Sequence, residues 1–168
     1  AGHRPVPPIC EAMWDRGTPV VFFTFGSLMP TDPKAVHEVL QMWSDAARRA
    51  GVIALMQCDY PWEWPIPKQI HLVTACSHED IFPRCVAVVH HGGAGTTHAC
   101  VRAGVPSIVV PHVADQFFWG ATVRSLRLGS VTRKRRAVDA EEIASHIRAV
   151  MTNREIRVAC ERAQKIAR

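Results

Sequence analysis

No uninterrupted apolar stretch in the 168 residues reaches about 18 residues, the length that a membrane-spanning helix requires. The amino-terminal segment also lacks the apolar centre of a secretion signal. We therefore expect a soluble, cytoplasmic protein whose precursor begins before Ala1. CxxC pairs are absent too. The six cysteines are scattered, which predicts reduced thiols rather than a disulfide framework.

Recognised nucleic-acid motifs are missing, although the formal net charge is +5. The basic excess lies mainly in residues 133–136 and 154–168, which we interpret as a solvated turn and a helix face, so we expect no nucleic-acid partner. Metal-ligand spacing is missing as well. Four histidines lie between residues 90 and 112, but they form no i,i+4 pair and have no carboxylate cluster beside them. We expect no metal, and no cofactor other than a substrate.

Apolar strands and amphipathic helices alternate along the chain. Residues 19–25 are continuously apolar, as in a strand buried on both faces of a parallel sheet. Further strands are predicted at 52–56, 70–73, 86–89, 107–110 and 129–132. Helices are predicted around 36–47 with Thr31 or Asp32 as N-cap, as a short turn or helix at 78–82, at 97–103 and 115–126, and twice after Asp139. This alternation predicts an α/β fold with a Rossmann-like, doubly wound parallel sheet of about six strands.

The amino-terminal segment differs from the rest of the chain. Residues 4–8 are rich in proline and are not expected to be helical, and a short amphipathic piece follows at 9–15. A hydrophobic content of 48% suits one globular domain. We therefore expect a linker with a short helix at residues 1–18 and a ligand-binding domain at residues 19–168.

Two glycine-containing segments follow predicted strands at the expected ligand edge. In the usual strand order 3-2-1-4-5-6, ligands bind between the carboxyl ends of the first and fourth strands. Those ends carry Gly26 and Ser27, and the segment 90–97 with Gly92, Gly93 and Gly95. Glycines before a helix bring backbone N–H groups and the positive end of the helix dipole to a ligand, which favours a phosphate or diphosphate. The alternative is a tight turn beside core histidines.

The glycine segment matches neither common nucleotide motif. It lacks the third glycine of the dinucleotide fingerprint, because His98 stands there, and it lacks Gly-Lys-Ser/Thr. Together with 102–106, Pro111 and the segment 115–120 that begins Asp-Gln-Phe-Phe, it closely resembles the carboxyl-terminal half of GT-B-fold, family 1 glycosyltransferases. The sequence of the segment 115–120 is most similar to that of sterol glucosyltransferases and related microbial lipid or natural-product enzymes. The resemblance covers the chain from Pro19 onward.

The resemblance implies a role for each matching residue. It assigns His90 to direct contact with the donor diphosphate, and Asp115 and Gln116 to hydroxyls of the transferred sugar, although Asp115 could instead cap a helix. The full diphosphate set implied is Gly26, Ser27, His90, His91, Gly93, Ala94, Gly95 and Thr96. The nucleoside region is implied at Ala75, Cys76, His78 and His98, where Ala75 replaces the stacking tryptophan of plant members and His98 replaces their ribose-binding glutamate.

The function implied is half of an inverting, metal-independent glycosyltransferase. The chain would bind a nucleotide-diphosphate sugar, with UDP-glucose as the first expectation, for transfer to a hydroxyl of a lipid, sterol or natural product. In this family the general base lies in an amino-terminal acceptor domain, so we expect the chain alone to be inactive. Three alternatives remain open: a donor subunit of a two-subunit GlcNAc-transferase, a non-catalytic nucleotide-binding module, and a relative of the peptidoglycan glycosyltransferases. Peripheral membrane contact would come through the acceptor.

Overall fold

The computed structural model describes residues 6–60 and 65–167. Within them, six parallel strands form one sheet in the order β3-β2-β1-β4-β5-β6, which confirms the predicted fold class and strand order. The strands are β1 (Val20–Thr24), β2 (Ile53–Gln57), β3 (Ile70–Val73), β4 (Ala87–His90), β5 (Ser107–Val109) and β6 (Gly129–Val131). Strand order therefore reverses between β1 and β4, where Thr24 pairs with His90.

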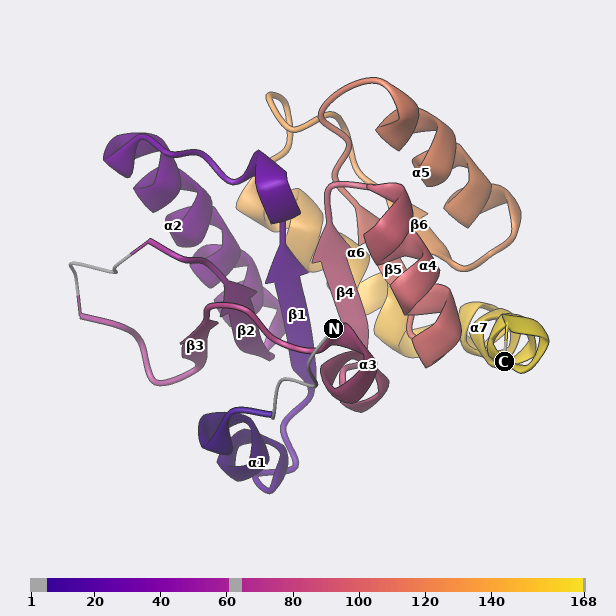
Figure 1. The fold of residues 1–168 in the computed structure, drawn as a ribbon, viewed down its shortest axis with the longest axis horizontal. Helices are drawn as coiled ribbons and strands as arrows, with labels where there is room; N and C mark the ends of the chain where they lie inside the picture. The colour runs from indigo at the N-terminus through magenta and orange to yellow at the C-terminus, as the bar shows by residue number, and fades with distance from the viewer. Residues whose placement is uncertain (1–5, 61–64, 168) are drawn as a thin grey trace.

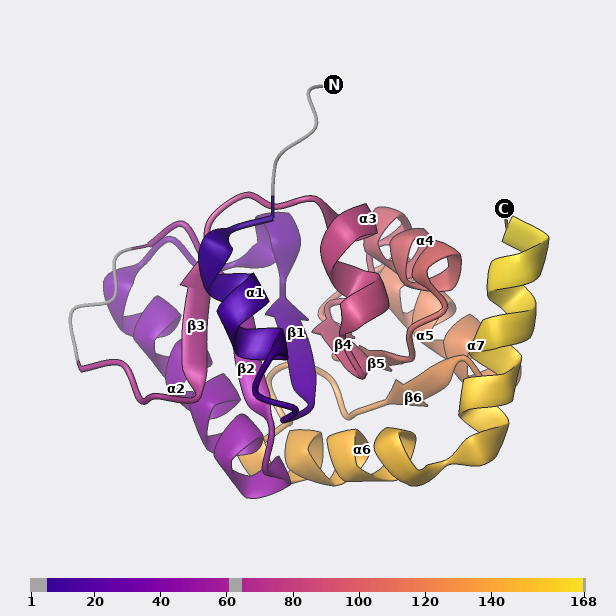
Figure 2. The same ribbon diagram turned by 90° about the horizontal axis from the view of Figure 1, so that it is seen from below.

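The helices are α1 (Pro8–Trp14), α2 (Pro33–Ala50), α3 (His78–Ile81), α4 (Ala94–Ala103), α5 (Asp115–Ser125), α6 (Ala140–Thr152) and α7 (Arg154–Ala167), with 3-10 turns η1 (Gly26–Leu28) and η2 (Phe82–Arg84). Helices α2 and α6 lie on one side of the sheet, and α3 and α4 on the other (Figures 1 and 2). Helix α7 stands beside α4. Both sides of the sheet are therefore covered, as a doubly wound fold requires.

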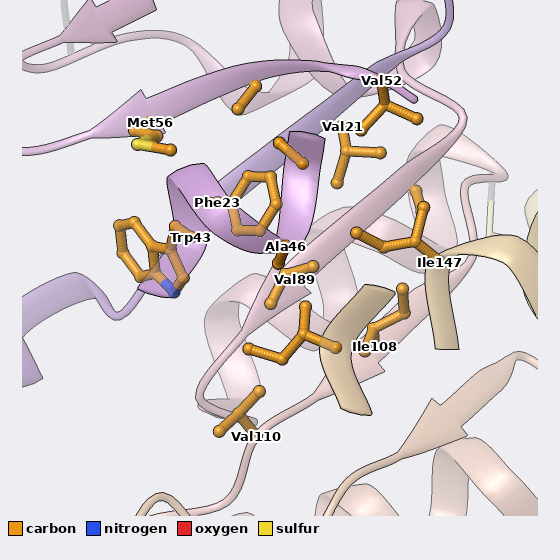
Figure 3. Close-up of a cluster of buried hydrophobic side chains, with 14 of the residues drawn as sticks. Val21, Phe23, Trp43, Ala46, Val52, Met56, Val89, Ile108, Val110 and Ile147 are labelled. Carbon is orange, nitrogen blue, oxygen red and sulfur yellow. The ribbon is translucent and has the colours of Figure 1, made fainter. Parts of the chain in front are cut away.

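The two faces of β1 belong to two separate cores. Val21 and Phe23 point toward α2 and α6, where Phe23 packs at 5.6 Å, centroid to centroid, from the indole of Trp43 (Figure 3). Phe22 points to the opposite face and packs against Phe82 at 5.2 Å. Since alternate residues of a strand face opposite ways, the continuous apolar run of β1 fills both cores at once.

Two helix starts differ from the sequence expectations. Helix α1 begins at Pro8, inside the proline-rich segment, because a proline at the first helical position loses no intrahelical hydrogen bond. Helix α4 begins at Ala94 rather than at residue 97, so Gly95 and Thr96 belong to its first turn. The predicted cap of α2 is confirmed as Asp32, whose carboxylate accepts the N–H of Ala35 at 2.9 Å.

Helix α1 is packed onto the domain. Cys10 and Met13 are buried, and Arg84 lies 3.7 Å above the Trp14 ring while its guanidinium donates to Glu11 at 2.8 Å.

Residues 1–5 of the expected linker, and residues 61–64 of the segment between β2 and β3, lie outside the described part. All six cysteines are free thiols. In the described residues, no helix combines the length and apolar character needed to cross a membrane.

Candidate functional site

The site lies at the carboxyl edge of the sheet, toward which the strand arrows in Figure 1 point. There η1 follows β1, and Gly92 and Gly93 follow β4. Because β1 and β4 are neighbours, these two segments leave the sheet side by side. The expected pairing of the two glycine-containing segments is thus present in the fold.

Helix α4 presents an amino terminus that no side chain caps. Gly93 is its N-cap residue, and the hydroxyl of Thr97 turns back to donate to the Gly93 carbonyl at 2.9 Å. No acidic residue lies in the first turn, which comprises Ala94, Gly95 and Thr96. Uncapped N–H groups and the helix dipole make this terminus suitable for an anion.

The imidazole of His91 lies between the two glycine-containing segments. A Cβ placed on Gly26 would come 3.1 Å from Cε1 of His91, and one placed on Gly93 would overlap Nε2. Gly26 also has a φ of +54°, a conformation that side chains disfavour. Both glycines are therefore required for the position of His91. Burial lowers the pKa of His91, and the negative charge of Asp115 opposes that shift, so the ring is neutral near pH 7 and can donate one hydrogen bond.

His90 does not lie where the resemblance placed it. Its side chain has no exposed surface, and its Nδ1 accepts the N–H of Gly92 at 3.1 Å. Burial lowers the pKa of His90 to about 3, so the ring is neutral with its proton on Nε2. Direct contact with a ligand phosphate is therefore not available to His90 in this conformation. His91, which directly follows β4, is the histidine at the edge, because its ring lies against Gly26 and Gly93.

Asp115 and Gln116 begin α5 but have different environments. The N-cap position belongs to Ala114 and no side chain caps the helix, so Asp115 is not a cap, and its carboxylate is exposed at the edge. Gln116 is 7% exposed, and its side-chain oxygen accepts the N–H groups of His112 at 2.8 Å and Val113 at 3.0 Å. The Gln116 oxygen therefore holds the loop before α5 and is already bonded, while Asp115 is free to meet a ligand hydroxyl.

The four residues expected near a nucleoside are separated into two places. Ala75 is exposed after β3, Cys76 packs against the second core, and the ring of His78 stacks on Phe82 at 4.4 Å. Burial lowers the pKa of His78. His98 is exposed on α4, edge-on to the Trp119 ring at 5.0 Å. Of the four, Ala75 and His98 are exposed, whereas Cys76 and His78 are partly buried.

One part of the edge was not anticipated from the sequence. Thr24 accepts the Gly26 N–H at 3.0 Å and donates to the side-chain oxygen of Gln57 at 3.0 Å. A cavity of about 570 Å³ lies beside η1, and its lining includes Thr24, Gly26, Ser27, Gln57 and Tyr60. Gln57 is the last residue of β2, at the ligand edge. This position at a strand end is the sequence feature that could have predicted its place in the site. A larger cavity of about 690 Å³ lies against α7, away from these residues.

The described residues contain no cluster of three histidine, cysteine or acidic side chains arranged for a metal ion. Burial also lowers the pKa of His112, whose Nδ1 donates to the Val110 carbonyl at 2.9 Å. The groups described above at this edge are backbone N–H groups, neutral imidazoles, hydroxyls and the Asp115 carboxylate.

Residues 42–167 match the family described as "Erythromycin biosynthesis protein CIII-like, C-terminal domain". The chain is similar to a sterol 3-beta-glucosyltransferase of Arabidopsis thaliana, with 35% identity over 140 residues that cover 80% of this chain and 22% of the relative. The chain therefore belongs to the EryCIII-like family, as the carboxyl-terminal, donor-binding domain of a GT-B-fold glycosyltransferase.

Solved structures agree with this fold. The protein Os79 of O. sativa, crystallised with UDP, superposes with a TM-score of 0.79 at 22% identity, covering 98% of this chain and 40% of that one. The glycosyltransferase VinC, crystallised with DTDP, gives a TM-score of 0.77 at 20% identity, covering 99% of this chain and 41% of that one. The chain thus spans about two fifths of these proteins and about a fifth of the Arabidopsis relative.

Proposed function

We propose that this domain binds UDP-glucose and acts as the donor half of an inverting, metal-independent glycosyltransferase. The observation that carries the proposal is the meeting of η1 and the uncapped start of α4 around His91, with the Asp115 carboxylate beside them. The similarity to a sterol 3-beta-glucosyltransferase supports glucose as the sugar and a sterol, lipid or natural-product hydroxyl as the acceptor. Uracil as the base agrees with the UDP bound to Os79.

The residues suit the departure of a diphosphate. When the bond to the anomeric carbon breaks, negative charge develops on the leaving phosphate oxygen. The N–H groups of Ala94, Gly95 and Thr96 and the dipole of α4 would stabilise that charge, and neutral His91 would donate a further hydrogen bond. The exposed Asp115 carboxylate would accept hydroxyls of the sugar. The acceptor and its general base would come from the acceptor domain that completes the GT-B fold.

The test is nucleotide binding by the chain, measured by calorimetry and by the shift of the melting temperature with UDP, UDP-glucose, DTDP and GDP. At a ligand concentration about 100 times the dissociation constant, binding adds about 2.7 kcal/mol to the free energy of unfolding. His91→Gln should weaken UDP binding by about tenfold through the lost contact. The matched control is His71→Gln on β3, which should bind as the unmodified chain does. If all four nucleotides at saturation leave the melting temperature unchanged, the proposal is wrong.

A further inference from the structure

The loop between β6 and α6 contains four basic residues, and one of them, Arg135, is less exposed to solvent than the other three. Arg133 donates to Glu142 at 2.7 Å and also reaches Asp139 at 3.4 Å, and Lys134 and Arg136 are exposed. Arg135 is half-buried. The sequence suggested that residues 133–136 form a solvated turn, and the structure differs from this at Arg135.

Arg135 is directed toward the ligand edge. Its backbone N–H donates to the Pro111 carbonyl at 2.9 Å, which ties the loop to the segment that leads into α5. Its guanidinium carbon lies 5.9 Å from the centroid of the Phe25 ring, and Phe25 directly precedes η1. Figure 1 shows this orange loop at the upper edge of the molecule, above the ends of the strands. Arg135 thus approaches the exits of β1 and β5 together.

A row of rings connects Arg135 with the centre of the site. The Phe25 ring lies edge-on to His112 at 4.5 Å, and His112 lies edge-on to His91 at 6.4 Å. Burial is the main cause of the lowered pKa of His112, and the positive charges of His91 and Arg135 act in the same direction. Arg135 therefore adds positive potential near Phe25, the residue that directly precedes η1.

No ion pair accounts for the position of Arg135. Among the carboxylates of residues 6–60 and 65–167, none lies within 4 Å of its guanidinium, and the acidic residue that acts on it from farther away is Glu38. Burial lowers the pKa of Arg135, which means that its charge is partly removed from water. A partly desolvated cation without a close carboxylate is therefore available to compensate the charge of a ligand anion.

We propose that Arg135 is a further donor-binding residue, whose guanidinium supplies positive charge to a diphosphate held between η1 and the start of α4. The proposal rests on the donor function above and extends it to a residue outside the motifs. Arginine is suited to this task because its planar fork binds phosphate through paired hydrogen bonds and remains charged at all relevant pH values. The diphosphate beside Gly26 and Ser27 would then be near both Arg135 and His91.

The experiment compares UDP with uridine, which differ by the diphosphate alone. Calorimetric titrations would use the unmodified chain, Arg135→Met, Arg135→Lys and the exposed control Arg136→Met. Methionine keeps an apolar stem over Phe25 and removes the charge, whereas lysine keeps the charge. We expect Arg135→Met to bind UDP about tenfold more weakly and uridine within twofold of the unmodified chain. Arg135→Lys should recover most of the UDP affinity, and Arg136→Met should change it less than twofold.

Each other outcome has a definite meaning. Unchanged UDP affinity in Arg135→Met overturns the inference and leaves the donor function intact. Equal losses for UDP and uridine in both Arg135 variants indicate a packing role on Phe25 and also overturn it, and melting temperatures identify a variant that fails to fold. An unmodified chain that binds neither compound overturns the proposed function, and the role of Arg135 with it. Loss of UDP affinity with rising salt should be steeper for the unmodified chain than for Arg135→Met.

Discussion

The imidazole of His91 occupies the space that a side chain on Gly93 would need. A Cβ on Gly93 would overlap Nε2 of that ring, whereas a Cβ on Gly95, two residues farther along, would meet nothing within 4 Å. The two glycines therefore serve different purposes. Gly93 is required by the packing of the protein itself, and Gly95 leaves open space at the exposed start of α4.

This difference predicts opposite effects of two alanine substitutions on stability. Gly93→Ala should displace His91, lower the melting temperature and weaken UDP binding. Gly95→Ala should leave the melting temperature unchanged or raise it, because alanine favours a helix over glycine by up to about 1 kcal/mol. Thermal melts and UDP titrations of both variants test the prediction. A Gly93→Ala protein that melts and binds as the unmodified chain does would contradict the arrangement around His91.

The neighbours Asp115 and Gln116 should also respond differently to substitution. Asp115→Ala removes an exposed carboxylate that caps nothing, so the free energy of unfolding should change by less than about 0.5 kcal/mol. Gln116→Ala leaves the N–H groups of His112 and Val113 without their acceptor and should cost about 1–3 kcal/mol.

Binding measurements separate the same pair further. Asp115→Ala should bind UDP with unchanged affinity and lose the preference among UDP-sugars, because the carboxylate meets the sugar and not the phosphates. Asp115→Asn is the matched variant that keeps the shape of the side chain. Equal losses of UDP affinity and UDP-glucose affinity in Asp115→Ala would show that the carboxylate has no sugar-specific role.

The sheet could be predicted from the sequence because its strands are short, apolar and separated by helices, and the connection rules for parallel strands leave few orders. The sequence did not predict which of the two histidines lies at the ligand edge. His90 ends a strand whose two faces are both buried and His91 directly follows it, so no alternation of polar and apolar residues shows which ring faces the edge. The start of α4 was missed because Ala94, Gly95 and Thr96 carry no apolar period. The direction of Arg135 depends on its tertiary contacts with Pro111 and Phe25, which a run of four basic residues does not reveal.

Buried neutral histidines make the fold sensitive to acid. The pKa of His90 is lowered by burial to about 3, well below its ordinary value near 6.5. Below pH 6.5 the unfolded chain binds a proton at this position and the folded chain does not, so stability is complete above pH 6.5 and decreases as the pH falls toward 3. The slope is up to about 1.4 kcal/mol per pH unit from His90 alone. His78, His91 and His112 are shifted in the same direction and add to it.

Denaturant unfolding between pH 7.5 and pH 5 measures this slope. His90→Asn keeps an acceptor for the Gly92 N–H and removes the titrating ring, so its free energy of unfolding should fall less steeply with acid than that of the unmodified chain. The control is His98→Asn, an exposed position that should keep the original slope. A His90→Asn protein with the unmodified slope would mean that the ring is not buried in neutral form.

The last prediction is that the chain by itself transfers no sugar. Displacement at an anomeric carbon needs an acceptor oxygen held in line about 3–3.5 Å away, and such positioning supplies about 7–11 kcal/mol of the barrier reduction. A positioned general base supplies a further factor of roughly 10² to 10⁴. The histidines near the ligand edge have other roles: His90 is buried, the His91 ring lies against two glycines, and His112 donates to a carbonyl. The chain spans only 22% of the Arabidopsis relative, so the assay contains nothing equivalent to most of that enzyme.

The assay mixes radiolabelled UDP-glucose with the chain and with sterol, lipid and phenolic acceptors, and it should give no labelled product. The full-length Arabidopsis relative serves as the positive control with sterols. Donor binding without transfer is the expected result. Turnover comparable to that control would place an acceptor site and a base within these 168 residues.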